Sequence, residues 1–378
     1  MSRRIPLVDL VAQHAALAGE IEPAVLRVLR SGKYILGAEV EAFERELAAA
    51  LGAAHVVACA SGTDALTLAL LALELHPGDE VIVPAFTFFV DAEVVSLLGG
   101  VPRLVDVDPR SCALDAQTVA RAVGPRTRAV IATDLYGVPA DIPALVAACA
   151  PRGVAVIEDA CQAIGSSLLG RAAGTLGDFG CASFFPTKNL GACGDGGAVI
   201  VADADRAHTL RALRNHGAPR KYHHELIGLN SRLDEVQAAI LRVKLRHLVA
   251  RQAARAAIAA RYDAALAPLG LAPPPPPPGH ATNHHLYTIR CAHRDALRDH
   301  LDRAGIDTAV HYPATVCQQP VYRGAHRDSD FPVATRLAAE VLSLPLYAEM
   351  SDADVERVIE AVRAFAERDQ LSAAIRSA

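Results

Sequence analysis

The segment Ser183-Phe184-Phe185-Pro186-Thr187-Lys188-Asn189-Leu190-Gly191 carries one lysine between an apolar run and a glycine-rich turn. The run Cys181–Phe185 is typical of a strand, and the turn extends from Gly191 to Gly197. A lysine amine has a reference pKa of about 10.4, so it becomes a nucleophile at neutral pH only when burial or a cationic neighbour helps it. Lys188 is therefore a candidate nucleophile, and the alternative is a lysine in an ordinary loop.

The length and composition of the chain indicate a globular protein with two domains. Its 378 residues exceed the size at which one core usually stops growing. No apolar run approaches the roughly 20 residues of a membrane span, and the charged start lacks the apolar region of a signal peptide. The net charge is −5 and no basic run occurs. We therefore expect a cytoplasmic protein without a membrane or nucleic-acid partner.

Cysteines and histidines give no metal-binding pattern. The eight cysteines are scattered without a Cys-x-x-Cys pair, which predicts buried, reduced thiols. His223-His224 lack a third ligand at a suitable spacing, and we expect His284-His285 to lie on a strand of the smaller domain. The sequence therefore predicts no metal site.

From His55 onward, short apolar runs rich in β-branched residues alternate with helical patterns. The strand-like runs are His55–Ala60, Glu80–Val83, Arg103–Asp106, Arg128–Thr133 and Val154–Glu158. This alternation predicts an α/β fold with a mostly parallel sheet and helices on both faces. Ligands bind such sheets at the carboxyl ends of the strands.

We expect a large domain over residues 1–245 and a smaller α+β domain over residues 246–378. The large domain would begin with helices over Ile21 to Leu29 and Ala38 to Leu51. A long helix is predicted from Leu233 to about Leu266, and Pro273 to Pro278 form a stiff connector.

Three motifs follow strand-like runs. Ser61-Gly62-Thr63-Asp64 opens a helix whose free N–H groups suit a phosphate, although an ordinary helix start has the same composition. Asp159 ends a strand where a buried acid needs a cation, which a pyridinium nitrogen or a salt-bridge partner would supply. The aromatics of Phe86-Thr87-Phe88-Phe89 would stack on a flat ring or belong to the core. Together with Lys188 these are the four requirements of covalently bound pyridoxal phosphate.

The chain resembles the DegT/DnrJ/EryC1/StrS sugar aminotransferases, a family of fold-type-I pyridoxal phosphate enzymes, over almost its whole length. The motifs that carry the resemblance are Ser31 to Gly37, Ser61 to Leu66, Glu158 to Ala163, Ser183 to Gly197, Leu213 to Gly217, Gly228 to Glu235 and His311-Tyr312-Pro313. The lysine motif and Asn230-Ser231-Arg232-Leu233-Asp234 are highly specific for the family.

The resemblance implies a role for each matching residue. Lys188 would hold the cofactor covalently and move the proton between the substrate and cofactor carbons. The other expected cofactor contacts are Asp159 at the ring nitrogen, Gln162 at the ring hydroxyl, Phe88 on the ring face, and Gly62, Thr63 and Ser183 at the phosphate. Asn230 would reach the phosphate from the neighbouring subunit, which implies an obligate homodimer with shared active sites. Phe185, Lys221, Tyr222, His311 and Tyr312 are the expected substrate contacts.

Three positions depart from the family pattern, and they bear on the contacts with the sugar. Phe185 stands where many relatives have tyrosine, and Asp134 stands where histidine is common. Thr315-Val316-Cys317 replaces a stretch that usually holds proline and a second histidine.

The resemblance implies transfer of an amino group, from glutamate as the expected donor, to a nucleotide-linked keto sugar. The stretch from Gly228 to Glu235 resembles enzymes that act at C-3 of dTDP-linked 3-keto-6-deoxyhexoses. Alternatives are a UDP-linked acetamido sugar, an aminocyclitol precursor, or a regulatory protein on the same fold. A regulatory protein has no chemical need for Lys188.

Overall fold

The computed structural model describes residues 3–377, and its centre is a seven-stranded sheet in the order β1-β9-β8-β5-β4-β2-β3. Its strands are β1 (His55–Cys59), β2 (Glu80–Pro84), β3 (Val101–Val105), β4 (Thr127–Thr133), β5 (Ala155–Asp159), β8 (Phe179–Ser183) and β9 (Gly197–Val201). β9 runs antiparallel to both of its neighbours, and the other strand pairs are parallel. The predicted α/β fold with a mostly parallel sheet is confirmed.

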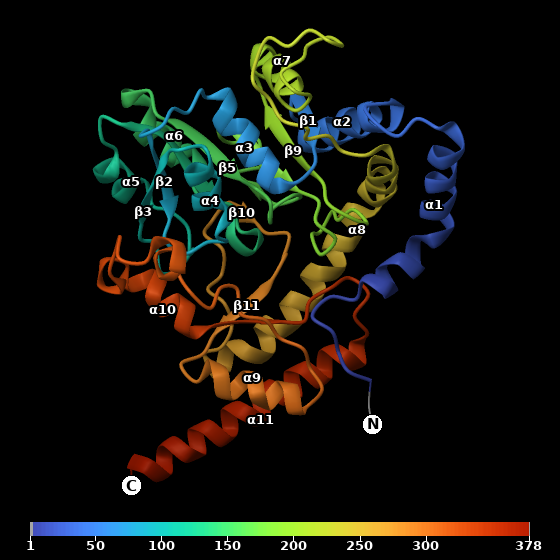
Figure 1. Cartoon of the computed structure of the whole chain (residues 1–378). Helices are drawn as coiled ribbons and strands as arrows, with labels where there is room; N and C mark the ends of the chain where they lie inside the picture. Colours follow the sequence, from blue (N-terminus) through green and yellow to red (C-terminus); the bar gives the residue numbers. More distant parts are fainter. Residues whose placement is uncertain (1–2, 378) are drawn as a thin grey trace.

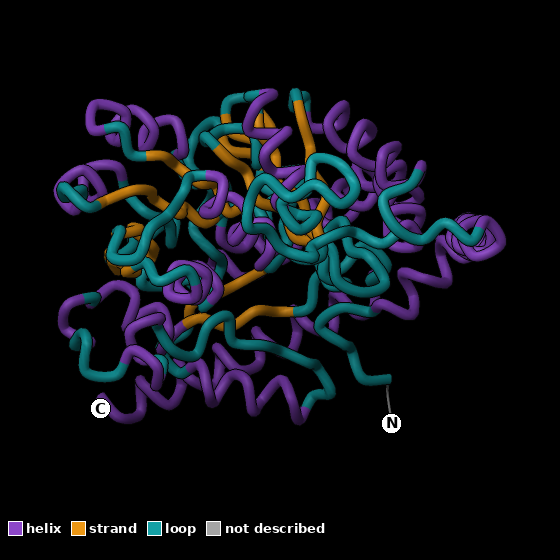
Figure 2. Tube along the Cα trace, turned by 45° about the horizontal axis from the view of Figure 1, so that its top comes forward, coloured by secondary structure: helices purple, strands orange, loops and turns teal. Residues whose placement is uncertain are grey.

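Helices cover both faces of this sheet, as Figures 1 and 2 show. The helices are α1 (Leu10–Ser31), α2 (Ala38–Leu51), α3 (Gly62–Ala72), α4 (Val90–Leu97), α5 (Ala116–Ala122), α6 (Ile142–Cys149), α7 (Ala204–Leu213), α8 (Glu235–Leu266), α9 (Arg294–Arg303), α10 (Pro332–Glu340) and α11 (Asp352–Ser377). Alternate strand residues face opposite layers. Val57 packs with α3, α4 and α7, and Val56 packs with α2 and α8.

A second core lies below the sheet in the view of Figure 1, around β11 (Tyr287–Arg290) and β12 (Val341–Leu344). It combines the second half of α8 with α9, α11 and the N-terminal residue Ile5. The predicted boundary at residues 245 and 246 falls inside the continuous helix α8, and the division into two domains stays a prediction. A small sheet of β6 (Ser167–Leu168), β7 (Arg171–Ala172) and β10 (His280–Ala281) joins segments from the two parts.

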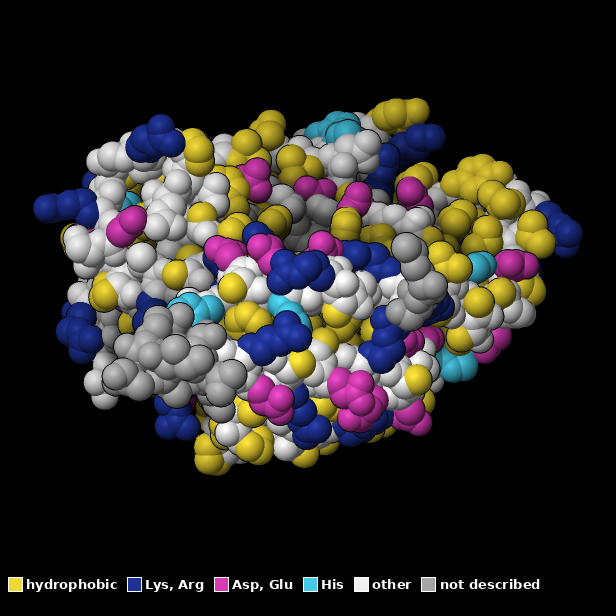
Figure 3. Space-filling model, turned by 90° about the horizontal axis from the view of Figure 1, so that it is seen from below, with side chains coloured by type: hydrophobic (Ala, Val, Ile, Leu, Met, Phe, Trp, Pro, Cys, Tyr) yellow, Lys and Arg dark blue, Asp and Glu magenta, His cyan; other side chains and the backbone are white. Residues whose placement is uncertain are grey.

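The surface below this core carries basic and acidic side chains side by side (Figure 3). Several form ion pairs, among them Arg4 with Asp307 and Arg261 with Asp352 at 2.6 Å. Within residues 3–377, no helix combines the length and apolar character needed to cross a bilayer. All eight cysteines are unpaired; six are buried, Cys161 is partly buried and Cys193 is exposed, so the expectation of burial was wrong for Cys193.

Candidate active site

Lys188 lies on the loop that follows β8. Its N–H donates to the carbonyl of Phe185 at 2.9 Å, which closes a turn. The buried ammonium of Lys244 on α8 secures this loop, because it donates to the carbonyl of Gly191 at 2.6 Å and to Gln13 Oε1 at 2.7 Å. Desolvation lowers the pKa of Lys188. A larger fraction of this amine is therefore neutral than in an exposed lysine.

A close contact between β8 and the start of α3 forms a cradle at the edge of the sheet. Ser61 caps α3 by accepting from the N–H of Asp64 at 3.0 Å, and Gly62 begins the helix. A Cβ atom on Gly62 would lie 2.7 Å from Ser183 Cβ and 3.0 Å from Cys161 Sγ, so only glycine fits. This contact brings the side chain of Ser183 next to the free N–H groups of the first turn of α3. Thr63, in the same turn, is exposed.

Asp159 ends β5 with its carboxyl group buried. Its Oδ1 accepts from the N–H of Cys161 at 3.0 Å. Burial lowers the pKa of Lys188, and the negative charge of Asp159 partly opposes this effect. The carboxylate of Asp159 is therefore close enough to act on the Lys188 amine. A buried carboxylate at the carboxyl edge of a parallel sheet suits a cationic ring nitrogen.

Gln162 is held by partners from two distant segments. Its Oε1 accepts from the N–H of Tyr136 at 2.9 Å, and its Nε2 donates to the hydroxyl of Tyr312 at 3.1 Å. The Tyr312 ring lies 5.7 Å from the ring of Phe88 and lines a cavity of about 100 Å³ with it. The structure thus brings Gln162, Tyr312 and Phe88 together beside Asp159.

Two histidines lie near Lys188. His311 is hydrogen-bonded through Nδ1 to Ser343 Oγ at 2.9 Å, and burial with the charge of Lys188 lowers its pKa to about 4. His285 contacts Asn189 Oδ1 at 3.1 Å, and burial followed by the Lys188 charge lowers its pKa well below the usual value. Both rings are therefore neutral near neutral pH.

His285 was not among the predicted site residues, and the expected position of His284-His285 on a strand was wrong. The strand β11 begins later, at Tyr287, because the preceding loop bonds to the large domain. Asn283 Nδ2 donates to the carbonyls of Gln162 and Ile164, both at 3.0 Å. These partners lie more than a hundred residues away in the chain, so no local sequence signal indicates them.

Three predicted residues lie apart from this cluster. Lys221 and Tyr222 are exposed on the loop that follows α7, with the Lys221 ammonium 5.0 Å from the centre of the Tyr222 ring. Asn230 is exposed and pairs with Asn215. Within residues 3–377, no hydrogen bond, ion pair or ring contact joins any of the three to Lys188.

The three departures from the family pattern take different positions. Asp134 is fully buried and accepts from the N–H of Ala140 at 2.8 Å, so it does not face a substrate. Val316 and Cys317 are buried in a single helical turn. Phe185 alone is exposed, by 50%, next to the lysine loop.

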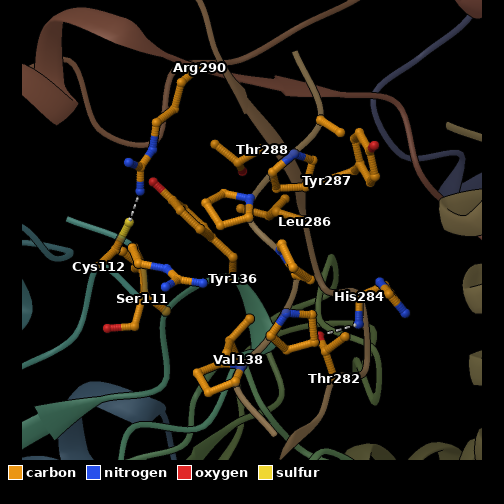
Figure 4. A pocket seen from close by; sticks show the side chains of 18 of the residues that line it. Ser111, Cys112, Tyr136, Val138, Thr282, His284, Leu286, Tyr287, Thr288 and Arg290 are labelled. Atoms are coloured by element: carbon orange, nitrogen blue, oxygen red, sulfur yellow. Dashed lines mark hydrogen bonds between the residues drawn. The ribbon is translucent and has the colours of Figure 1, made fainter. Parts of the chain in front are cut away.

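A separate cavity of about 630 Å³ lies between the proline connector and the large domain (Figure 4). Arg290 reaches across it to Cys112 Sγ at 3.1 Å. None of the predicted site residues lines this cavity. Tyr136 stands between the two regions, because its N–H donates to Gln162 and its hydroxyl donates to the carbonyl of His311.

The residues present fit pyridoxal phosphate. The cradle at Gly62 has the donors for a phosphate, Asp159 suits a ring nitrogen, and Lys188 supplies an amine of lowered pKa. Among the described residues, no group of three or more histidine, cysteine or acidic side chains could hold a metal ion.

Comparisons with known proteins agree with this geometry. A model of the DegT/DnrJ/EryC1/StrS aminotransferase family matches residues 16–363. A UDP-N-acetyl-3-dehydro-alpha-D-glucosamine 3-aminotransferase of Acidithiobacillus ferrooxidans is 46% identical over 95% of this chain and 97% of its own. A dTDP-3-amino-3,4,6-trideoxy-alpha-D-glucose transaminase of Streptomyces venezuelae is 45% identical over 97% of both chains. The crystal structure of S. venezuelae DesV with a ketimine intermediate superimposes with a TM-score of 0.94, at 45% identity, over 97% of this chain and 99% of that one.

Proposed function

Because the chain belongs to the DegT/DnrJ/EryC1/StrS aminotransferase family, we propose that it aminates C-3 of a nucleotide-linked keto sugar with pyridoxal phosphate held on Lys188. The observation that carries this proposal is the cluster of Lys188, Asp159, Gln162 and the Gly62 cradle at one edge of the sheet. The amino donor in this proposal is an amino acid, with glutamate as our prediction.

In this proposal, each residue of the cluster either binds the cofactor or transfers a proton. Bound pyridoxal phosphate would supply an electron-withdrawing ring that stabilises negative charge on the carbon bearing the amine. Asp159 would bind the ring nitrogen, Gln162 the ring hydroxyl, and Gly62, Thr63 and Ser183 the phosphate, with Phe88 against the ring. Lys188 Nζ would carry the proton between the two carbons, which its lowered pKa favours.

The proposed sugar is a dTDP-linked 3-keto-6-deoxyhexose. Phe185 exposes about half of its side chain, at 50%, and this apolar surface suits the methyl group of a 6-deoxy sugar. His311 and Tyr312 would contact the ring, and Lys221 and Tyr222 the diphosphate. The 46% identity to a UDP-sugar 3-aminotransferase favours a second candidate, a UDP-linked 3-keto acetamido sugar.

We also propose an obligate homodimer with shared sites. Tyr222 and Ile227 are exposed by 85% and 93% on the loop after α7, and apolar side chains exposed in this way are typical of an interface. In the dimer, Asn230 would reach the partner's cofactor phosphate. The unpaired cysteines fit a reducing compartment, and we propose the cytoplasm.

The reverse reaction tests the substrate. The enzyme is incubated with 2-oxoglutarate and one of three sugars: a 3-amino dTDP-6-deoxyhexose, its 4-amino isomer, or a UDP-linked 3-amino acetamido sugar. Glutamate formation is then followed. Preference for the first supports the full proposal, and preference for the third changes only the nucleotide and sugar. Preference for the 4-amino isomer contradicts amination at C-3.

A further inference from the structure

Asp91, in the first turn of α4, is fully buried next to the cofactor-site carboxylate. Its Oδ2 accepts from Thr87 Oγ1 at 2.8 Å and from Thr133 Oγ1 at 2.6 Å. Thr133 is the register partner of Asp159 across β4 and β5, so the two side chains leave the same face of the sheet. The carboxyl group of Asp91 therefore lies against that of Asp159.

The two oxygens of Asp91 have different surroundings. Oδ2 receives both hydroxyl groups, whereas no N–H or O–H group of the described residues reaches the buried Oδ1. An ionised Asp91 would leave Oδ1 unsatisfied and would place two negative charges in contact. A protonated Asp91 carries its proton on Oδ1 and can donate it to a carboxylate, and Asp159 is the carboxylate beside it.

The other groups around Asp91 do not change this assignment. Burial raises the pKa of Asp91, and the charge of Asp159 raises it further. The titratable groups that also face it are the thiol of Cys181 on β8 and the phenol of Tyr312. Burial raises the pKa of both, so both are neutral near neutral pH, and neither offers Asp91 a cation.

We propose that Asp91 is a positioning residue that stays protonated and donates a hydrogen bond from Oδ1 to Asp159. The inference rests on the proposed binding of pyridoxal phosphate. A donor to Asp159 stabilises its ionised form, so the proton shared with the cofactor stays on the ring nitrogen rather than on Asp159. Thr87 and Thr133 orient Asp91 by occupying its other oxygen.

A second carboxyl pair provides a matched control. Asp134 Oδ1 accepts from Ala140, and Glu158 Oε2 accepts from the N–H of Leu176 at 2.8 Å. Their remaining oxygens, Oδ2 and Oε1, are buried without an N–H or O–H partner. Glu158 precedes Asp159 on β5, so its side chain leaves the opposite face of the sheet. Substitution at Asp134 therefore removes a buried carboxyl group without removing the donor to Asp159.

The test compares binding of pyridoxal phosphate with that of its 1-deaza analogue, in which carbon replaces the ring nitrogen. Dissociation constants are measured by fluorescence titration of the cofactor-free protein. Asp91→Ala is expected to lower the preference for pyridoxal phosphate by about tenfold or more, the effect of one hydrogen bond to a charged group. Asp91→Asn, whose amide can donate from the same position, is expected to restore the preference to within about threefold of wild type. Asp134→Ala is expected to retain the full preference.

The outcomes distinguish an Asp91 that donates a hydrogen bond to Asp159 from one that does not. An unchanged preference in Asp91→Ala overturns the proposal. A raised preference in either Asp91 variant overturns it as well, because loss of a donor to Asp159 cannot raise the preference. Should Asp91→Ala not fold, the double variant Thr87→Val with Thr133→Val removes both orienting hydroxyl groups, and an unchanged preference there overturns the proposal. A wild-type protein that does not bind pyridoxal phosphate contradicts the proposed function instead.

Discussion

The side-chain amide of Gln162 donates to the hydroxyl of Tyr312 at 3.1 Å across a separation of 150 residues. The other end of this amide accepts from the N–H of Tyr136, so its orientation is defined at both ends. A predicted cofactor ligand and a predicted substrate contact are therefore coupled. A change at Tyr312 is expected to alter cofactor binding as well as sugar binding.

Tyr312→Phe removes the acceptor for Gln162 and keeps the ring against Phe88. We expect a threefold to tenfold loss of pyridoxal phosphate affinity, about the effect of one hydrogen bond, measured by fluorescence titration. Tyr322→Phe is the control, because the Tyr322 ring packs on Phe89 at 5.8 Å and its hydroxyl donates to the carbonyl of Ala92. Equal losses in both variants would show a general packing effect.

Lys188→Ala is expected to abolish transamination, by about a thousandfold or more, because both the cofactor anchor and the proton carrier are lost. Circular dichroism should show an unchanged fold. Borohydride reduction and peptide mapping of the wild-type protein should place the label on Lys188. A label on another lysine would refute the assignment. The matched control for Lys188→Ala is Lys33→Ala, at an exposed position, which should keep its transaminase activity.

Gly62→Ala is expected to weaken pyridoxal phosphate binding by about tenfold and to lower the free energy of unfolding by about 1–3 kcal/mol. The cause is the added Cβ atom, 2.7 Å from Ser183 Cβ. Gly19→Ala is the control. Gly19 lies inside α1, and a Cβ atom added there would have nothing within 4 Å. That variant should gain about 0.5–1 kcal/mol with unchanged affinity. Retained affinity in Gly62→Ala would argue against the phosphate cradle.

The contribution of His311 to the stability of the cofactor-free protein is expected to be lost as the pH decreases from about 6.5 toward about 4. The folded state holds the pKa of His311 at about 4, below the usual value near 6.5, so the unfolded chain takes up the proton first. His285 acts in the same direction. Urea unfolding midpoints at about pH 7 and about pH 5 should differ less in His311→Gln than in wild type. His208→Gln, an exposed position on α7, should keep the wild-type difference.

Shared active sites predict complementation between two inactive variants. Lys188→Ala lacks the anchor, and Asn230→Asp would place a negative charge against the partner's cofactor phosphate. Mixed dimers should regain one intact site each, measured as transaminase activity after subunit exchange. Exchange is followed by mass spectrometry of the two differently tagged chains. A mixture that exchanges and stays inactive would contradict shared sites.

Local patterns in the sequence determined the class of fold and indicated the candidate residues of the site. Alternating strand and helix patterns predicted the parallel sheet, because the spacing of apolar residues that identifies each element can be recognised within a short segment of sequence. The ends of several elements differ from the predicted ones. The expected strand Cys181–Phe185 became Phe179–Ser183, since Phe184 leaves the ladder and donates to the carbonyl of Gly196 at 2.7 Å. The first helix begins at Leu10, well before the predicted start at Ile21. Its buried side chains, among them Leu17 and Ile21, pack on α8.

The tertiary structure alone decided which side chains meet around the predicted residues. Gln162 and Tyr312, His285 and Asn189, and Asp91 and Asp159 are pairs from distant segments, and no short-range pattern encodes them. The raised pKa of Asp91 and the lowered pKa of His311 also follow from burial, which depends on how the whole chain packs. Residue types and order can be read from the sequence, but the surroundings that set their charges exist only once the sheet and the second core close around them.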